Sequence, residues 1–566
     1  MSKPGRLSVL ALACVLAAPA AFARGGIPVA RCSDTRAGNW AEATGVSDPR
    51  GDVRVYAIQF KQDIRHVESY DSFDAKMRCL MHELVLPTAD LDRDLRADNP
   101  TIVVFNEDAG LATIATGSRG AAARAVAAHG PKDPANIPGA LSAFGSLGAG
   151  YAPAIEHYAA KAPETSPQRL ILAAATDTFA RGFMKVNSEI ARDYGVYVVS
   201  SNNQAEFRAV DVQDDPEILA IADPDLLEQY AAGRLRTVYE AVDVPGNGPG
   251  RDGIDVYNQA WMWAPVEDVT DYANQRWSRI NGSPLTADDP RANVINVNKK
   301  TPLTPIERTI LDLSDDSDTT PANTGPFTLL PEHDPSGRIK IGYGISLPSF
   351  MWGTTETGGK RFGTYLHDNV DPCARPTTWM RCLDARGVNL FLQPEANPGR
   401  WADYIDVSWK PAAFQALSWL DSAWRAVADP SVKNIRYAVT PHLVGNLVDL
   451  TFDGQSVILE RCIGEGDAST CAGNRPRTFV GASEFVPCAP GVTQRCDDPL
   501  LEPYTGPHDE FIVTAAWVAD DCDACANAVA NRERLAARAR AMEAGSGSPF
   551  ENDYLETALW ADLDFD

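Results

Sequence analysis

The sequence is poor in positive charge for its 566 residues. Its 51 lysines and arginines are outnumbered by 76 aspartates and glutamates, which gives a formal net charge of −25. Such a surface repels phosphate backbones and anionic lipid heads, so it argues against nucleic acid and membrane surfaces as partners. Long apolar runs are also missing after residue 22. We therefore expect no later segment of the chain to cross a bilayer.

Several motifs of known catalytic sites are missing as well. The chain has no G-x-S-x-G string, which argues against an α/β-hydrolase. Its eight histidines form no H-E-x-x-H pair and no other paired metal-ligand spacing. No Walker loop is present, and no G-x-G-x-x-G string lies between a predicted strand and a predicted helix, as a Rossmann fingerprint requires. The sequence therefore predicts chemistry without a metal or a cofactor, or simple binding.

The N-terminus has the pattern of a secretory signal. Two basic residues precede an apolar run over residues 7–22, and Ala21-Phe-Ala23 fits the small-x-small rule for cleavage. We expect residues 1–23 to be removed, which makes the mature protein secreted or periplasmic. A membrane anchor is disfavoured because Pro19 interrupts a run that is short for a span. A lipoprotein site at Cys14 is a third interpretation, and its surroundings match that motif imperfectly.

Cysteine usage agrees with export. Without Cys14 the chain has ten cysteines, an even number. In an oxidising compartment they are most simply interpreted as disulfides between cysteines that lie close in the sequence. The expected pairs are Cys373 with Cys382, Cys462 with Cys471, Cys488 with Cys496, Cys522 with Cys525, and, as the remaining pair, Cys32 with Cys79. A structural zinc site is the competing interpretation, although the spacings do not form two CxxC pairs around a short loop.

Short apolar and β-branched runs recur along the chain and alternate with helical stretches. The predicted strands cover residues 53–60, 102–105, 196–200, 255–263, 339–345 and 389–393. An Ala-rich region at roughly 118–193 predicts two or three helices, broken at prolines such as Pro138. The stretches 264–294 and 314–335 are interpreted as irregular surface insertions. This alternation of strands and helices indicates a layered α/β fold.

Three strings place reactive side chains where predicted strands end. In Ile102-Val-Val-Phe-Asn-Glu107 a carboxylate follows a buried run, a usual position for active-site groups in α/β folds. In Asn298-Lys-Lys-Thr-Pro-Leu-Thr-Pro-Ile-Glu307 two prolines hold the backbone extended behind Lys300, so its ammonium can be aimed at a fixed point. In Arg338-Ile-Lys-Ile-Gly-Tyr-Gly-Ile-Ser346 a strand leads into a serine. Lys299 is the alternative lysine, and each string alone also fits an ordinary loop.

Read together, these strings resemble the Glu, Lys and Cys segments of the nitrilase, or carbon–nitrogen hydrolase, superfamily. A fourth string, Gly387-Val-Asn-Leu-Phe-Leu-Gln-Pro-Glu-Ala-Asn397, resembles the strand and loop that follow the nucleophile in that family. The resemblance covers roughly residues 53–455. It implies a four-layer α-β-β-α sandwich, here with a helical insertion. It also implies pairing through the helical layer, so a homo-oligomer is expected.

The resemblance also implies roles for individual residues. Glu107 would be the general base, and Lys300 would stabilise the oxyanion of a tetrahedral intermediate. Glu307 would position the substrate or the surroundings of the nucleophile. Ser346 stands where the family has its cysteine, and Pro348 stands where an aspartate is common there.

The serine makes proton transfer to a carboxylate harder. A thiol with a pKa near 8.5 lies about four units above a glutamate, so the transfer costs roughly 6 kcal/mol. A serine hydroxyl is on the order of five units weaker as an acid, which adds on the order of 7 kcal/mol. No cysteine lies within twenty residues of Ser346. The nucleophile is thus the open point of the site.

We therefore expect an exported carbon–nitrogen hydrolase that acts on non-peptide C–N bonds in a small-molecule amide or nitrile. The alternative is a catalytically inactive protein of the same fold that binds a ligand or a partner. The expected organisation is a signal at 1–23, a nitrilase-like domain at 24–460, and a Cys-rich extension at 461–566. Within the extension we expect little regular structure at 461–510 and a surface helix at 526–544.

Overall fold

The structure is a computed structural model. The predicted signal at 1–23 lies outside the described residues, and so do Cys471, the cysteines from 488 to 525 and the helix expected at 526–544. The described residues are 32, 40–89, 99–129, 137–243, 253–267, 269–315, 325–352, 371–374, 376–397, 404–407, 410–429, 431–447, 450–452, 454–464, 511–515 and 555–566.

Seven strands form the main sheet. In spatial order they are β1 (Thr44–Val46), β19 (Thr557–Leu563), β2 (Val53–Gln59), β4 (Thr101–Val104), β5 (Tyr197–Ala205), β8 (Val256–Trp263) and β9 (Val294–Lys299). The central strands β2, β4 and β5 are parallel, and β8 and β9 each pair antiparallel with the preceding strand. As a result β4 and β9 run in the same direction, and their carboxyl ends lie at the same edge of the sheet.

Five strands form the second sheet. In spatial order they are β10 (Ile341–Tyr343), β11 (Leu390–Leu392), β14 (Tyr437–Thr440), β17 (Val457–Glu460) and β18 (Phe511–Thr514). The first three are parallel and the other two pair antiparallel. Every strand that the sequence predicts is present in one of the two sheets.

An apolar core joins the two sheets face to face. Val55 of β2 and Val104 of β4 lie in one buried cluster with Leu392 of β11. Their neighbours Tyr56 and Val103 belong instead to the cluster beneath the helices. Successive side chains of a strand point to opposite faces of its sheet. The continuous apolar runs of β2 and β4 thus follow from burial on both faces.

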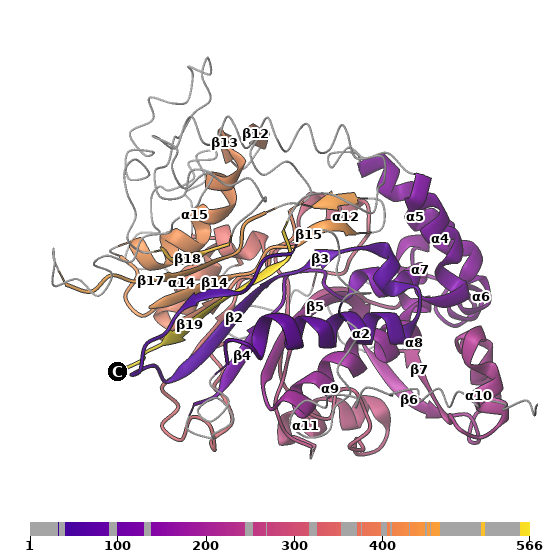
Figure 1. Cartoon of the computed structure of the whole chain (residues 1–566). Coiled ribbons are helices and arrows are strands. Elements are labelled where there is room, and N and C mark those ends of the chain that lie inside the picture. The colour runs from indigo at the N-terminus through magenta and orange to yellow at the C-terminus, as the bar shows by residue number, and fades with distance from the viewer. Residues whose placement is uncertain are drawn as a thin grey trace, which may run out of the picture.

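Helices cover the outer faces of both sheets (Figure 1). α7 (Pro167–Ala174), α8 (Thr176–Phe179) and α9 (Lys185–Tyr194) contact β5, whereas α15 (Gln415–Ala428) contacts β14 and β17. The predicted four-layer α-β-β-α sandwich is confirmed. The other α-helices are α2 (Tyr70–Leu80), α4 (Gly117–His129), α5 (Ile137–Gly150), α6 (Ala152–Lys161), α10 (Leu227–Ala231), α11 (Asp271–Asn281), α12 (Pro305–Thr309) and α14 (Trp379–Ala385).

Shorter elements complete the layers. The 3₁₀ segments are η1 (Ile64–Val67), η3 (Leu111–Ala115), η5 (Pro216–Ala220), η6 (Pro224–Leu226), η7 (Leu347–Phe350) and η8 (Pro376–Thr378), and the π-helical ones are η2 (Met81–Val85) and η4 (Ala180–Met184). The small sheets are β16 (Leu450–Phe452) with β15 (Val444–Leu447) and β3 (Lys61–Gln62), β6 (Phe207–Asp211) with β7 (Thr237–Ala241), and β12 (Tyr404–Val407) with β13 (Lys410–Phe414).

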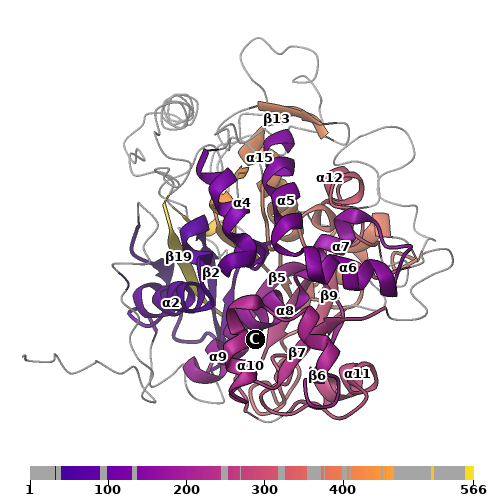
Figure 2. The ribbon, with the colours of Figure 1, turned by 90° about the vertical axis from the view of Figure 1, so that its right-hand side faces the viewer.

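Two predictions for the regions between the strands, those for the Ala-rich region and for 264–294, are corrected. The Ala-rich region forms more than three helices, among them α4 and α5, which pack on each other (Figure 2). Pro138 is the second residue of α5, a position where a proline costs no hydrogen bond, so it starts a helix rather than breaking one. The stretch 264–294 is not irregular throughout, because it contains α11. Thr270 caps the start of that helix, and Trp277 anchors it in the core.

The range 461–566 supplies strands to both sheets. β18 ends the second sheet, and β19 lies between β1 and β2 in the main sheet. β19 is antiparallel to β2 over seven residue pairs, from Thr557 opposite Gln59 to Leu563 opposite Val53. These parts of the expected extension therefore belong to the sandwich itself. β18 pairs with β17, which is near in the sequence, whereas the place of β19 depends on pairing over about 500 residues.

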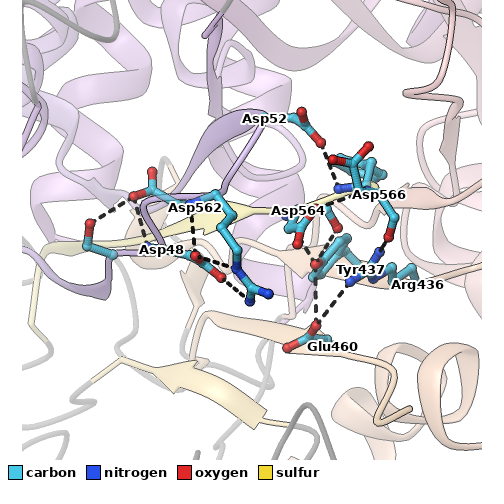
Figure 3. A network of polar contacts seen from close by, with 11 residues as sticks. Asp48, Asp52, Arg436, Tyr437, Glu460, Asp562, Asp564 and Asp566 are labelled. Atoms are coloured by element: carbon cyan, nitrogen blue, oxygen red, sulfur yellow. Dashed lines mark hydrogen bonds and ion pairs between the residues drawn. The ribbon is translucent and has the colours of Figure 1, made fainter.

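Polar contacts hold the chain's last residues at one end of the sheets (Figure 3). Tyr437 donates from its hydroxyl to the main-chain oxygen of Asp564 over 2.8 Å, and Arg436 donates to that of Asp566 over 2.9 Å. The main-chain N–H of Phe565 donates to Asp52 over 2.8 Å. The end of β19 is thereby connected to β14 and to the turn before β2.

Two of the expected disulfides are confirmed. Cys32 is bonded to Cys79, and Cys373 is bonded to Cys382. Cys462 is also disulfide-bonded, and its expected partner lies outside the described residues. Within the described ranges, no helix combines the length and the apolar character that a membrane span needs.

Candidate active site

Three of the predicted residues lie in direct contact. Lys300, which follows β9, donates from Nζ to Oε1 of Glu107 over 2.6 Å. The same ammonium lies 2.9 Å from Oε2 of Glu307. Glu107 lies just beyond the end of β4, so the common direction of β4 and β9 brings the two residues to one edge. All three side chains are buried. Lys300 rather than Lys299 makes these contacts.

Asn258 of β8 connects the two carboxylates. Its Nδ2 donates to Oε1 of Glu107 over 2.7 Å and to Oε1 of Glu307 over 2.6 Å. Its main-chain oxygen accepts from the N–H of Lys300 over 2.8 Å. The amide thus fixes the separation of two groups of like charge, and the lysine lies between them.

Burial and charge act against each other in this cluster. Burial raises the pKa of Glu107, and the negative charge of Glu307 adds to the rise, although Lys300 opposes it. For Glu307 burial also opposes the charged form, but Lys300 and the N–H of Thr304 hold its pKa below the usual value. The two carboxylates overcome the effect of burial on Lys300 and raise its pKa. Lys300 is therefore a permanent cation.

The contacts of Glu307 indicate a positioning role. It lies in the first turn of α12, where Thr304 and Glu307 form a reciprocal capping box. Oε2 of Glu307 accepts from the N–H of Thr304 over 2.8 Å and from its hydroxyl over 2.7 Å. With Asn258 on Oε1 and Lys300 on Oε2, the carboxylate is fully engaged. It holds Lys300 in place.

Ser346 lies between the end of β10 and the start of η7. It is buried, and its backbone has φ 51° and ψ −109°, a conformation that L-residues rarely adopt. Its N–H donates to the oxygen of Pro394 over 3.1 Å, and its own carbonyl accepts from the N–H of Ser349 over 2.9 Å. Strain of this kind costs on the order of 1–3 kcal/mol and gathers at functional sites.

The approach to Ser346 requires a glycine at position 344. A Cβ there would lie 2.8 Å from the ring of Phe391 in the neighbouring strand β11. The N–H of Gly344 donates to the main-chain oxygen of Leu392 over 3.0 Å, so the pairing of β10 with β11 continues almost to Ser346. The absence of a side chain at position 344 permits this close approach.

Glu395 is a further buried carboxyl group, which follows β11. The hydroxyl of Ser346 and the charge of Lys300 lower its pKa, and the charge of Glu107 raises it. Burial, followed by the negative charge of Glu107, raises its pKa to about 8. Gln393 donates to Oε1 of Glu395 over 2.6 Å. The site thus holds a third carboxyl group, which the sequence did not single out.

A row of polar side chains continues the site across the main sheet. Asn203 of β5 pairs directly with Asn258 of β8, which in turn bonds Lys300, so the three side chains share one face. Both amide atoms of Asn203 and Oδ1 of Asn258 are buried and have no hydrogen-bond partner in the described part of the chain. Each such atom costs about 1–3 kcal/mol, so a polar molecule bound at this face would satisfy them.

Asn258 and Glu395 were missed because the first lies in a string interpreted as a strand, and the second in a string interpreted as the strand and loop that follow the nucleophile. A signal was present in each case. Asn258-Gln259 interrupts an otherwise apolar buried strand, and Glu395 follows a strand end in the same way as Glu107. A carboxylate that directly follows a buried strand is thus the more general signal for this site.

No protein-family model and no curated protein matches the chain. Among solved structures, it is similar to an amidase from Nesterenkonia sp., with 12% sequence identity and a TM-score of 0.30, over 73% of this chain and 84% of that one. A cysteine-to-serine mutant of the amidase from Nesterenkonia AN1, described as a member of the nitrilase superfamily, gives 12% identity and a TM-score of 0.28, over 73% and 85% of the two chains.

Proposed function

We propose that this protein is an exported hydrolase of non-peptide C–N bonds, in a small-molecule amide or nitrile, with Ser346 as its nucleophile. The arrangement that carries the proposal is the ammonium of Lys300 held by Glu107 and Glu307, beside a carboxyl group that interacts with Ser346. A fixed cation that can stabilise an oxyanion is what an acyl-transfer site requires.

In the proposed reaction the oxygen of Ser346 attacks the carbonyl carbon of the amide. The carbonyl electrons move to oxygen, and Lys300 stabilises the resulting oxyanion. The C–N bond then breaks, the nitrogen leaves with a proton, and water hydrolyses the ester on Ser346. In the resemblance to the nitrilase superfamily, Glu107 is the general base of this sequence, and Glu307 holds Lys300.

Export is part of the proposal. The signal-like N-terminus supports it, and so do the disulfides between Cys32 and Cys79 and between Cys373 and Cys382, since disulfides persist in oxidising compartments.

Binding without turnover is the second candidate function. The serine at position 346 favours it, because a hydroxyl is a far weaker acid than a thiol. The unpartnered amide of Asn203 favours a polar ligand under either function.

The test is release of ammonia by the full chain from a panel of short amides and nitriles. Under the proposal, the native protein releases ammonia and Ser346→Ala abolishes the release. If the native protein is inert and Ser346→Cys gains activity, the site is retained for binding and the second candidate holds. If Ser346→Cys is inert both to the panel and to a thiol-alkylating probe, both candidates fail.

A further inference from the structure

Asn203 of β5 is a fully buried amide that has no hydrogen-bond partner for its side chain in the described part of the chain. The neighbouring Asn202, on the other face of the strand, is satisfied within the protein. Its Nδ2 donates to Gln204 over 3.2 Å, and its Oδ1 accepts from the N–H of Asn203 over 2.8 Å. A buried amide without partners costs free energy that an apolar residue does not. The protein thus keeps a donor and an acceptor at position 203 that a bound molecule can use.

Asn203 lies on the face of the main sheet that carries Lys300. It pairs directly with Asn258 of β8, whose main-chain oxygen accepts from the N–H of Lys300 over 2.8 Å. Directly opposite residues of antiparallel strands point to the same face. Adjacent strands lie about 4.8 Å apart, so the backbones of Asn203 and Lys300 are separated by about 10 Å. A small molecule held at Lys300 can therefore extend to Asn203.

The same face of β5 is turned toward the second sheet. Val199 precedes Asn203 by four residues, and its side chain therefore points to the same side of the strand. It lies in one buried cluster with Tyr343 of β10 and Leu392 of β11. Since Ser346 follows β10, the proposed nucleophile, the cation and the unsatisfied amide all belong to the layer between the two sheets.

The side chain of Asn258 adds one acceptor to this face. Its Nδ2 donates to Glu107 over 2.7 Å and to Glu307 over 2.6 Å. Carboxylates that share an ammonium accept hydrogen bonds, so the amide nitrogen must face them and the carbonyl Oδ1 must be the other atom. That Oδ1 is buried and has no partner among the residues described. The two asparagines together thus offer one NH₂ group and two carbonyl oxygens.

A primary amide is complementary to this set of atoms. It presents one carbonyl oxygen and two N–H bonds. The carbonyl can accept from Nδ2 of Asn203 while one N–H donates to Oδ1 of Asn203, as two amides do when they pair side by side. The other N–H points away from Asn203 and can donate to Oδ1 of Asn258 on the next strand. A carboxylate has no N–H for either carbonyl oxygen, and the charge of Glu107 repels it.

We propose that Asn203 and Asn258 form a subsite for a second primary amide of the substrate, the first being the amide that is cleaved beside Lys300. The inference rests on the proposed function for the identity of the cleaved bond. It narrows the substrate to a small diamide that is neutral at both ends. Asn203 then determines specificity and takes no part in the transfer of protons.

The experiment measures binding separately from turnover. Malonamide, succinamide and glutaramide are titrated by calorimetry into the full chain carrying Ser346→Ala, which cannot form an ester and so consumes no ligand. Each diamide is compared with two analogues, in which an isopropyl group or a carboxylate replaces one of its amides. We expect at least one diamide to bind about 10- to 100-fold more tightly than both of its analogues, because only the diamide satisfies the asparagines.

Asn203→Leu separates recognition from a structural role. Leucine is similar in size to asparagine but has no polar atom, so the variant should bind the diamide and its isopropyl analogue about equally. It should also unfold at a higher urea concentration than the native protein, whereas loss of a structural asparagine would lower that concentration. Asn187→Leu is the matched control, because it removes another buried amide with an unpartnered oxygen, from α9 on the outer face of the main sheet. Its preference for the diamide should equal that of the parent.

The outcomes distinguish this inference from the proposed function. If no diamide binds more tightly than its analogues, or if Asn203→Leu keeps the preference, the subsite is rejected, and release of ammonia from simple amides by the native protein still supports the proposed function. If a diamide binds through Asn203 but the native protein releases no ammonia from it, the subsite is supported and the proposed nucleophile is rejected. If the native protein does hydrolyse the diamide, Asn203→Leu should lower kcat/KM for the diamide more than for its isopropyl analogue.

Discussion

The ammonium of Lys300 donates to the carboxylate of Glu107 over 2.6 Å, although 193 positions separate the two residues in the chain. The contact is buried and is completed by Glu307 on the other side of the ammonium. One cation therefore faces two carboxylates away from water. The stability and the chemistry of this edge of the sheet both depend on the pairing of the Lys300 cation with these two carboxylates.

Lys300→Met should destabilise the protein by about 3–5 kcal/mol at pH 7, because two buried carboxylates lose the cation that they share. The loss should be smaller at pH 5, since the pKa of Glu107 is already raised and the variant can neutralise that group by protonation. Urea unfolding at the two pH values measures both effects. The second substitution Glu107→Gln in the Lys300→Met background should recover part of the lost stability. An equal loss at both pH values would contradict the prediction.

The sequence indicated Glu107, Lys300 and Glu307 because each follows or ends a recognisable string. Local patterns also predicted the strands that carry them. Asn258 could not be chosen in the same way, since its contacts depend on how β8 pairs with β5 and β9. The place of β19 in the main sheet is a register over about 500 residues, which no local pattern encodes.

Stability should depend on pH through Glu395. Its pKa is raised from 4.5 to about 8 in the folded protein, so between these values the unfolded chain loses a proton that the folded chain keeps. The free energy of unfolding then falls as pH rises, by up to about 5 kcal/mol from this group. Glu395→Gln should therefore gain stability relative to the native protein between pH 5 and pH 8.5. Chemical unfolding of both proteins at the two pH values measures this difference.

The matched comparison is Glu460→Gln. Glu460 is the last residue of β17, an inner strand of the second sheet, and is only partly buried. The change from pH 5 to pH 8.5 should therefore alter the stability of Glu460→Gln, relative to the native protein, much less. If the two variants show the same pH dependence, the burial of Glu395 is not its cause.

The C-terminal strand should be indispensable for folding. Asp562 of β19 accepts from Nε of Arg54 in β2 over 2.7 Å, and both side chains are buried. Asp562→Asn leaves the arginine without its counter-charge and should cost about 3–5 kcal/mol in urea unfolding. Arg338→Ala removes partly exposed pairs with Asp52 and Asp566 at the same end, and should cost about 0–1 kcal/mol.

Removal of residues 555–566 is a stronger test of the same point. It deletes β19 and leaves the facing edges of β1 and β2 without hydrogen bonds. We expect no cooperative unfolding transition in the shortened chain. If the shortened chain unfolds cooperatively at the same urea concentration as the native protein, β19 is not needed for the folded state and the prediction is wrong.

Ser346→Gly should make the protein more stable and inactive at once. The backbone of Ser346 has φ 51° and ψ −109°, which a glycine adopts without strain because it has no Cβ. The expected gain over Ser346→Ala is about 1–2 kcal/mol, since alanine keeps the Cβ that strains this conformation, whereas both variants lack the hydroxyl. Urea unfolding of the two variants at pH 7 gives the difference. If Ser346→Gly and Ser346→Ala are equally stable, the backbone of residue 346 is not strained. Backbone strain then no longer supports a functional role for Ser346.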